Sequence, residues 1–198
     1  MNEFNRAVFL ALNGNPDSSR ALVLFAIVAA KYLIALVPAH LVLVWIAGDR
    51  KMRFVALSTL LALVIAIVIN QAIGLVAYTP RPFLLGLGHQ LIEHRDSSSL
   101  PSNHATIFFT YGATLLIYRL RGLGIAAILL GLIVAWSRIF LGIHFPLDMI
   151  AAAITSTIAA FAAVWLMARY GTPLLSRAEG IYAPVGRLIG ARVGRRVG

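Results

Sequence analysis

Long apolar runs separated by short polar segments make up most of the chain. A helix needs about 20 mostly apolar residues to cross a bilayer. Five segments approach this length: 21–47, 54–77, 105–118, 122–136 and 147–168. The third and fourth are short enough to be buried helices of a soluble protein, but their place between two long spans favours membrane helices. The pattern predicts an all-α integral membrane protein, a single domain over residues 1–198 with a bundle of about five transmembrane helices.

The composition narrows the class of protein further. Hydrophobic residues make up 60% of the 198 residues and charged residues 12%, whereas soluble domains contain about 25% charged residues. This excludes a disordered chain, a coiled coil and an ordinary cytosolic enzyme. Cysteine is absent, which excludes thiol chemistry, disulfides and thiolate metal sites. The first 20 residues are mixed and polar, without the basic start and apolar run of a cleavable signal.

The formal net charge of +10 would suggest a nucleic-acid partner for a soluble chain. In a membrane protein, Lys and Arg instead mark the cytoplasmic loops. The loop segments on the N-terminal side, which carry five arginines, are 1–20, 78–104 and 137–148. Those on the opposite side, which carry eleven Lys or Arg, are 48–53, 119–121 and 169–198. We therefore expect no nucleic-acid partner, a cytoplasmic basic tail over 169–198, and an N-terminal side that faces the periplasm or exterior.

Segment 172–198 of this tail is also rich in glycine. Its arginines and scattered apolar residues suit contact with anionic lipids. A solvated, partly disordered tail fits the same composition, and the sequence leaves both alternatives open.

Nearly all polar residues of chemical interest fall in three stretches, 78–82, 97–104 and 137–148, and the span pattern places all three on the N-terminal side. Ionisable groups at a membrane edge are costly and therefore mark functional sites. Each residue alone has a plainer explanation, such as a snorkelling arginine, a helix cap or a local hydrogen bond. Their convergence predicts a site at the extracytoplasmic membrane edge.

The third stretch contains Arg138, His144 and Asp148. Pro146 suits the first turn of a helix, so His144 would precede a helix that carries Asp148 in its first turn. The carboxylate can accept the proton of one imidazole nitrogen and leave the other as a nucleophile. Arg138 has a planar fork that suits phosphate oxygens.

The other two stretches point to the same chemistry. Ser102 or Asn103 can cap a helix whose free N–H groups bind an anion, and His104 can act as a general acid. Arg81 lies between two prolines that stiffen its loop. Together these groups suit a phosphoryl group. Because no carboxylate cluster is present for magnesium, we expect chemistry without a metal or cofactor.

These motifs resemble the type 2 phosphatidic acid phosphatase superfamily. Its signature has three parts: Lys-x6-Arg-Pro, Pro-Ser-Gly-His and Ser-Arg-x5-His-x3-Asp. The third part fits fully as Ser137-Arg138-x5-His144-x3-Asp148, and the second reads Pro101-Ser102-Asn103-His104. The first keeps Arg81-Pro82 but has Gly74 in place of the lysine. By motif the resemblance covers residues 74–148, and by span pattern it covers most of the chain.

The resemblance implies a role for each matching residue. His144 would attack phosphorus and Asp148 would orient it, while His104 would protonate the leaving group and then activate water. The phosphoryl oxygens would be held by Arg81, Arg138, Ser102 and the Asn103 amide, with Ser137 as an accessory. Asn103 replaces the usual Gly or Asp, which alters the loop slightly.

Lys31, in the first apolar run, is a candidate to replace the lysine missing at Gly74. It lies about 15 Å along the helix from the membrane edge at 1.5 Å per residue, so it reaches the phosphate only if the pocket is deep. Alternatively, Lys31 pairs with a polar group such as Asn70 or lines a water-filled cavity.

Segment 86–94 is similar to the bacitracin-resistance type of undecaprenyl diphosphatase, which acts on the outer face of the bacterial inner membrane. This implies a polyprenyl diphosphate substrate and membrane lipids as surroundings. His94, with His89 and Glu93, could contact the second phosphate or only shape the loop. A phosphatidate or phosphatidylglycerophosphate phosphatase remains an alternative. The spacing of Arg138, His144 and Asp148 argues against a transporter or lipid-binding protein, which needs no nucleophile.

Overall fold

The computed structural model of the chain describes the backbone of residues 3–194 and the side chains of residues 3–184. The elements in chain order are α1 (Glu3–Leu12), α2 (Arg20–Lys31), η1 (Leu33–Ala35), α3 (Leu36–Ala47), α4 (Arg50–Val76), η2 (Pro82–Leu85), α5 (Asn103–Ile117), α6 (Arg121–Phe140) and α7 (Pro146–Gly194). All regular elements among the described residues are helical, as the apolar pattern predicts.

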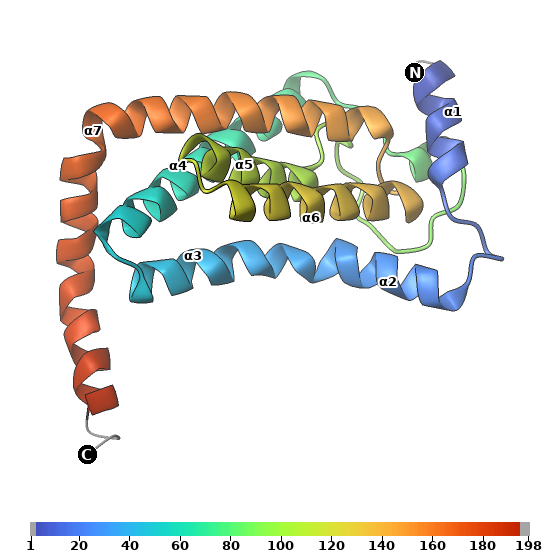
Figure 1. The fold of residues 1–198 in the computed structure, drawn as a ribbon. Helices are drawn as coiled ribbons and strands as arrows, with labels where there is room; N and C mark the ends of the chain where they lie inside the picture. The colour runs from blue at the N-terminus through green and yellow to red at the C-terminus, as the bar shows by residue number, and fades with distance from the viewer. Residues whose placement is uncertain (1–2, 195–198) are drawn as a thin grey trace.

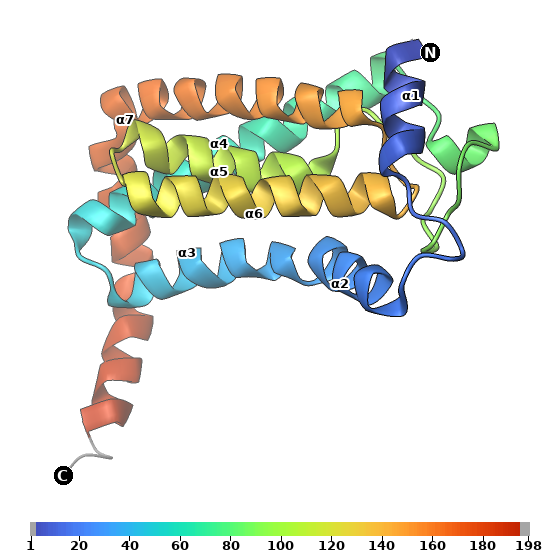
Figure 2. The ribbon, with the colours of Figure 1, turned by 45° about the vertical axis from the view of Figure 1, so that its right-hand side comes forward.

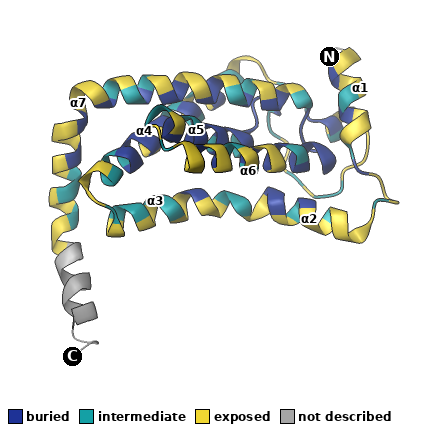
Figure 3. Ribbon diagram, viewed as in Figure 1, coloured by how far each residue is buried: buried dark blue, intermediate teal, exposed yellow. Residues whose placement is uncertain are grey.

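The helices α4, α5, α6 and the first half of α7 form a bundle with α5 at its centre (Figure 1). The helix α5 packs against the other three, while α2 packs on α6 and α3 on α4. In the turned view, α2 and α3 form an outer layer beside α6 (Figure 2). Buried residues gather on α5 and on the inward faces of its neighbours, and exposed residues cover the outward faces (Figure 3).

Four of the described helical segments are long and apolar enough to cross a membrane: Arg20–Ala47, Arg50–Val76, Arg121–Phe140 and Pro146–Pro184. The helix α5, predicted as a span over 105–118, has 15 residues and is shorter than the thickness of a bilayer requires. Most of its side chains are buried between its neighbours. The prediction of an all-α, multi-pass membrane bundle is confirmed, with four candidate spans in the described residues in place of about five, and α5 is the enclosed central helix.

The first predicted span is not one continuous helix. The helix α2 ends at Lys31, and the 3-10 turn η1 joins it to α3. Pro38, in the first turn of α3, has no N–H for the carbonyl of Ile34, and its ring crowds that carbonyl. The 3-10 turn η1 relieves this conflict. Lys31, the last residue of α2 before this turn, is exposed.

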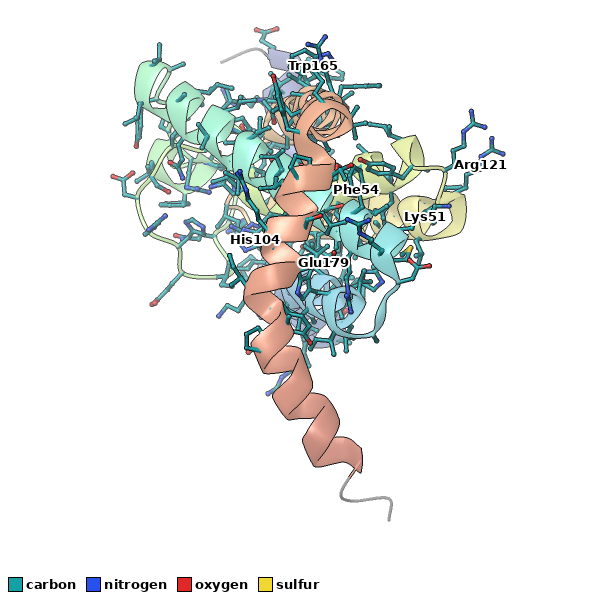
Figure 4. The ribbon with its side chains drawn as sticks, turned by 90° about the vertical axis from the view of Figure 1, so that its left-hand side faces the viewer. Lys51, Phe54, His104, Arg121, Trp165 and Glu179 are labelled. Atoms are coloured by element: carbon teal, nitrogen blue, oxygen red, sulfur yellow. The ribbon has the colours of Figure 1, made fainter. Side chains whose placement is uncertain are left out.

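The last span begins at Pro146, as predicted, but extends far beyond the expected end near residue 168. The helix α7 continues through Pro173 and Pro184 to Gly194 and bends sharply where it leaves the bundle (Figure 1). Its distal half crosses one end of the bundle (Figure 4). A proline in a helix removes one backbone hydrogen bond and favours such a bend. Residues 172–194 of the predicted tail are therefore helical, and 195–198 lie outside the described residues.

Side chains fasten the distal half of α7 to the bundle. Glu179 forms ion pairs with Arg50 at 3.4 Å and Arg53 at 3.6 Å. The rings of Tyr182 and Trp45 meet edge to face, with their centroids 6.2 Å apart. The distal half of α7 therefore contacts the protein itself. The sequence had suggested either contact with anionic lipids or a solvated, partly disordered tail.

The helix α1 was not predicted, because residues 1–20 show no long apolar run. Its Asn5 Oδ1 accepts a hydrogen bond of 3.0 Å from the backbone N–H of Leu147, in the first turn of α7. Its Phe9 is fully buried, with its ring centroid 5.2 Å from that of Phe145. The helix α1 thus fixes the start of α7, where His144 and Asp148 lie.

The close contact between α5 and α6 depends on glycine. A Cβ atom at Gly112 would lie 2.7 Å from Ile128 Cδ1, and small residues allow membrane helices to approach closely. We expect Gly112→Leu to push the helices apart and to destabilise the protein by about 1–3 kcal/mol. Thermal unfolding in detergent should show a lower Tm. Gly122→Leu is the control, because nothing lies within 4 Å of a Cβ at Gly122; equal shifts in both variants would contradict the prediction.

Candidate active site

A cavity of about 740 Å³ opens where α4 ends and α5 begins. Its walls come from α4, the loop that connects η2 to α5, the start of α5, the end of α6 and the turn before α7. The predicted site residues among its lining are Arg81, His94, Asn103, His104, Arg138 and His144. The three motif stretches therefore meet at one end of the bundle, as the span pattern predicts.

A tight turn between α6 and α7 places His144. Gly142 has a φ of +78°, and a Cβ there would clash with the backbone carbonyl of His89. Only glycine adopts this conformation without strain and leaves space for the neighbouring loop. His144 follows the turn and is 2% exposed. Its Nδ1 lies 3.0 Å from Asp148 Oδ2, so the contact predicted from their spacing is present.

The proton of His144 can be assigned from its neighbours. Arg81 Nη1 lies 3.0 Å from His144 Nε2. Because arginine only donates hydrogen bonds, Nε2 must accept this bond. Nδ1 then carries the proton and donates it to Asp148. The imidazole is therefore neutral, with its lone pair on Nε2, which is the form that a nucleophilic histidine requires.

Arg81 also holds the surrounding loops together. Its guanidinium donates to the backbone oxygens of Ser97 at 3.0 Å, Ser98 at 3.1 Å and Ile143 at 2.7 Å, and to Ser97 Oγ at 3.1 Å. Burial lowers the pKa of Arg81 to about 10, against the opposing charge of Asp148, so it remains a cation at neutral pH. The predicted phosphate ligand is thus largely engaged with protein groups.

Arg138 keeps part of its hydrogen-bonding capacity free. Its Nη2 lies 3.0 Å from His94 Nε2, and its buried Nε has no partner among the described residues. An unpaired buried donor is costly, and an anion in the cavity would satisfy it. The ring centroid of His94 lies 6.4 Å from that of His144, so this accessory candidate is beside the nucleophile. Burial lowers the pKa of His94, which favours its neutral form.

The second motif stretch contributes three residues with different surroundings. His104 lines the cavity, and its ring has no hydrogen-bond partner among the residues that the structure describes. Asn103 also lines it, and its Oδ1 accepts a hydrogen bond from Asn70 at 2.9 Å. Ser102 is fully buried, makes no side-chain cap on α5 and has an unpartnered Oγ. The predicted capping bond is absent, and Ser102 is not among the residues that line the cavity.

Two accessory candidates lie outside the cavity lining. Lys31 is exposed at the end of α2, a helix that packs on α6 rather than on α4. Asn70 bonds to Asn103 and Thr106 instead of Lys31. Lys31 therefore does not replace the cation missing at Gly74. Ser137 is buried and donates to the carbonyl of Val134 in its own helix at 2.7 Å.

Ser99 is a site residue that the sequence did not single out. It is fully buried, and its Oγ donates to Asp148 Oδ2. The same Ser99 Oγ lies 3.3 Å from His144 Nδ1. Its backbone N–H donates to the carbonyl of Thr79 at 2.8 Å. The only signal was a run of three serines before Pro101, in which nothing distinguishes one serine from another.

Within the part of the chain that the structure describes, no three His, Asp or Glu side chains are grouped to hold a metal ion. The site instead presents two arginines, a neutral histidine paired with a carboxylate, and a second histidine open to the cavity. Such a set can bind and attack a phosphoryl group.

The match to known families decides the identity. Residues 55–171 match the PAP2 superfamily. The chain belongs to this superfamily. It is 29% identical over 182 residues to YbjG of Escherichia coli (strain K12), covering 92% of each chain. It is 29% identical to undecaprenyl-diphosphatase BcrC of Bacillus subtilis (strain 168), covering 79% of this chain and 81% of BcrC.

A solved structure has a similar fold. The crystal structure of Aquifex aeolicus LpxE superposes with a TM-score of 0.67 at 21% identity, covering 82% of this chain and 96% of LpxE. This structural similarity supports the arrangement of the helices described above.

The contact of Ser99 with Asp148 predicts a positioning role. Ser99→Ala should lower kcat for a lipid phosphate about tenfold, because hydrogen bonds to charged groups contribute about 1.5–3 kcal/mol. Without this donor, the Asp148 carboxylate accepts more strongly from His144, so the acid limb of the pH profile should move to higher pH. Steady-state phosphate release measures both, with Ser18→Ala in an exposed loop as control. An unchanged kcat with an unchanged acid limb would show that Ser99 has no such role.

Proposed function

We propose that this PAP2 protein hydrolyses undecaprenyl diphosphate to undecaprenyl phosphate and inorganic phosphate, and so recycles the lipid carrier of cell-wall synthesis. The observation that carries the proposal is the neutral His144 at the cavity wall, with Nδ1–H donated to Asp148 and the lone pair on Nε2. The relative from Bacillus subtilis that covers 79% of the chain is named an undecaprenyl-diphosphatase, which supports the choice of lipid.

In the proposed first step, His144 Nε2 attacks the terminal phosphorus and the bond from phosphorus to the bridging oxygen breaks. His104 donates a proton to the departing oxygen, and undecaprenyl phosphate leaves. Asp148 stays ionised and stabilises the positive charge that develops on the ring. Arg81 Nη1 now bonds Nε2, so this donor must turn to a phosphoryl oxygen when substrate binds.

In the second step, His104 removes a proton from water, which attacks the phosphohistidine. The bond from nitrogen to phosphorus breaks, inorganic phosphate forms and His144 regains its lone pair. Across both steps the reaction consumes one water. The ring of His104 is open to both proton transfers because it lines the cavity and has no partner among the described residues. Burial lowers the pKa of His104 to about 3, so the negative charge of the bound substrate must raise this pKa before His104 can donate the first proton.

Positioning and charge stabilisation account for most of phosphoryl transfer. We propose that Arg138, through its unpartnered Nε, and the free N–H groups at the start of α5 hold the phosphoryl oxygens. The helix dipole of α5 favours an anion at this end. Because these groups supply the positive charge, we propose that hydrolysis needs no metal.

We further propose that the cavity faces the outside of a bacterial inner membrane and that the distal half of α7 lies on the cytoplasmic side. The support is the excess of Lys and Arg, eleven against five, in the sequence segments predicted to lie on the side opposite the motif stretches. Lys51 and Arg121 belong to the starts of α4 and α6, and the ion pair of Glu179 with Arg50 places the distal half of α7 beside the start of α4.

The activity can be tested with purified protein in detergent and a chelator present. Wild-type protein should release phosphate from undecaprenyl diphosphate, and His144→Ala should lose activity by at least about a thousandfold, as expected for a missing nucleophile. His89→Ala is the matched control, because this histidine is exposed and outside the cavity.

Faster turnover of phosphatidate or phosphatidylglycerophosphate in a lipid panel would replace the proposed substrate. Absence of phosphate release from every lipid phosphate would revive the transporter or lipid-binding alternative.

The environment of His144 predicts an unusual pH dependence. Burial lowers its pKa to about 4, although the hydrogen bond and charge of Asp148 oppose the shift. The nucleophile is neutral above this pKa and protonated below it. The value of kcat/KM should therefore stay constant between pH 7 and about pH 5 and fall as the pH drops through about 4. Tryptophan fluorescence checks that the protein remains folded; an acid limb near 6.5, the ordinary histidine pKa, would contradict the prediction.

A further inference from the structure

Arg95 is a cation that lines the cavity without a partner. Its side chain is exposed, and its guanidinium makes no hydrogen bond or ion pair with any residue that the structure describes. In contrast, Arg81 and Arg138 both bond to protein groups inside the cavity. Arg95 is therefore the cation at the cavity mouth that is free to bind a ligand.

The backbone of Arg95 is linked to Arg138 through His94 by two successive hydrogen bonds. Arg138 donates to His94 Nε2, so His94 carries its proton on Nδ1. This Nδ1–H donates to the carbonyl oxygen of Arg95 at 2.9 Å. The neighbouring carboxylate of Asp96 accepts a hydrogen bond of 2.8 Å from Tyr78. The backbone of Arg95 is thus tied to the buried Arg138, while the acidic side chain next to it in sequence is occupied by Tyr78.

The α4 wall of the cavity leaves space for such a cation. Gly74 lines the same cavity, and a Cβ there would lie 3.4 Å from Ser98 Cβ, an ordinary contact. Packing therefore does not require glycine, but no side chain extends from this position. Lys31 does not reach the cavity, so Arg95 is left to supply the additional positive charge.

We propose that Arg95, positioned by His94, binds the phosphate that remains on the lipid and so selects diphosphate lipids over monophosphate lipids. This inference rests on the proposed function. The transferred phosphoryl group lies between His144, Arg138 and His104, and the second phosphate extends from it towards the mouth. A diphosphate carries more negative charge than a monophosphate, and the exposed Glu93 at the cavity wall would repel it without a nearby cation.

Direct binding tests the proposal independently of turnover. Calorimetry would compare two hydrolysis-resistant ligands with the same tail, farnesyl methylenediphosphonate and farnesyl phosphonate. Arg95→Ala should raise the Kd of the diphosphonate about tenfold and change that of the phosphonate less than about twofold. Arg20→Ala, which removes an exposed arginine outside the cavity lining, should change neither. Equal weakening of both ligands, or no weakening of either, overturns the proposal and leaves the hydrolase assignment to its own test.

A relocated cation provides a second test. Adding Gly74→Lys to Arg95→Ala places a positive charge on the α4 wall of the same cavity, and it should restore at least half of the lost preference for the diphosphonate. Gly122→Lys in the same background restores the net charge outside the cavity lining and should restore none. The placement of the second phosphate is overturned by either of two results. In one, adding Gly74→Lys restores none of the preference for the diphosphonate that Arg95→Ala loses. In the other, Gly122→Lys restores this preference as well as Gly74→Lys does.

Discussion

The carboxylate oxygen Oδ2 of Asp148 is the point on which three separate chain segments depend. It accepts hydrogen bonds from His144 Nδ1, from the backbone N–H of Phe145 and from Ser99 Oγ. Asp148 is 1% exposed, and a buried charge is stable only when it is paired and hydrogen-bonded. The start of α7, the turn before it and the loop before α5 must therefore meet around this atom, and their meeting forms one wall of the cavity.

Arg81 connects this wall to the rest of the site. It reaches the carbonyl of Ile143 and the nitrogen of His144 on one side and the backbone of Ser97 and Ser98 on the other. The two arginines and the one carboxylate of this site are all buried, so the charges of these three groups leave a net positive charge. An anion would supply the missing negative charge, so the forces that hold the loops also favour phosphate binding.

The sequence predicted the parts of this arrangement that depend on spacing along one helix. The interval between His144 and Asp148, with Pro146 between them, was sufficient to predict their contact and the start of α7. It could not show that Ser99 rather than its neighbours bonds Asp148, because that choice depends on the path of a loop. The exposed position of Lys31 likewise depends on which face of α2 packs on α6, a matter of long-range packing.

The arginines of the cavity differ in how firmly the protein holds them, and this difference fits their positions. Arg81 is fixed by several protein hydrogen bonds, Arg138 by one with a donor unused, and Arg95 by none at its guanidinium. In the proposed reaction, negative charge develops in the transition state on the oxygens around the phosphorus near His144, where donors must be oriented beforehand to be effective. In the proposed scheme a group at the mouth must instead release the product, and an exposed side chain without protein partners can bind and release an anion without disturbing the buried network.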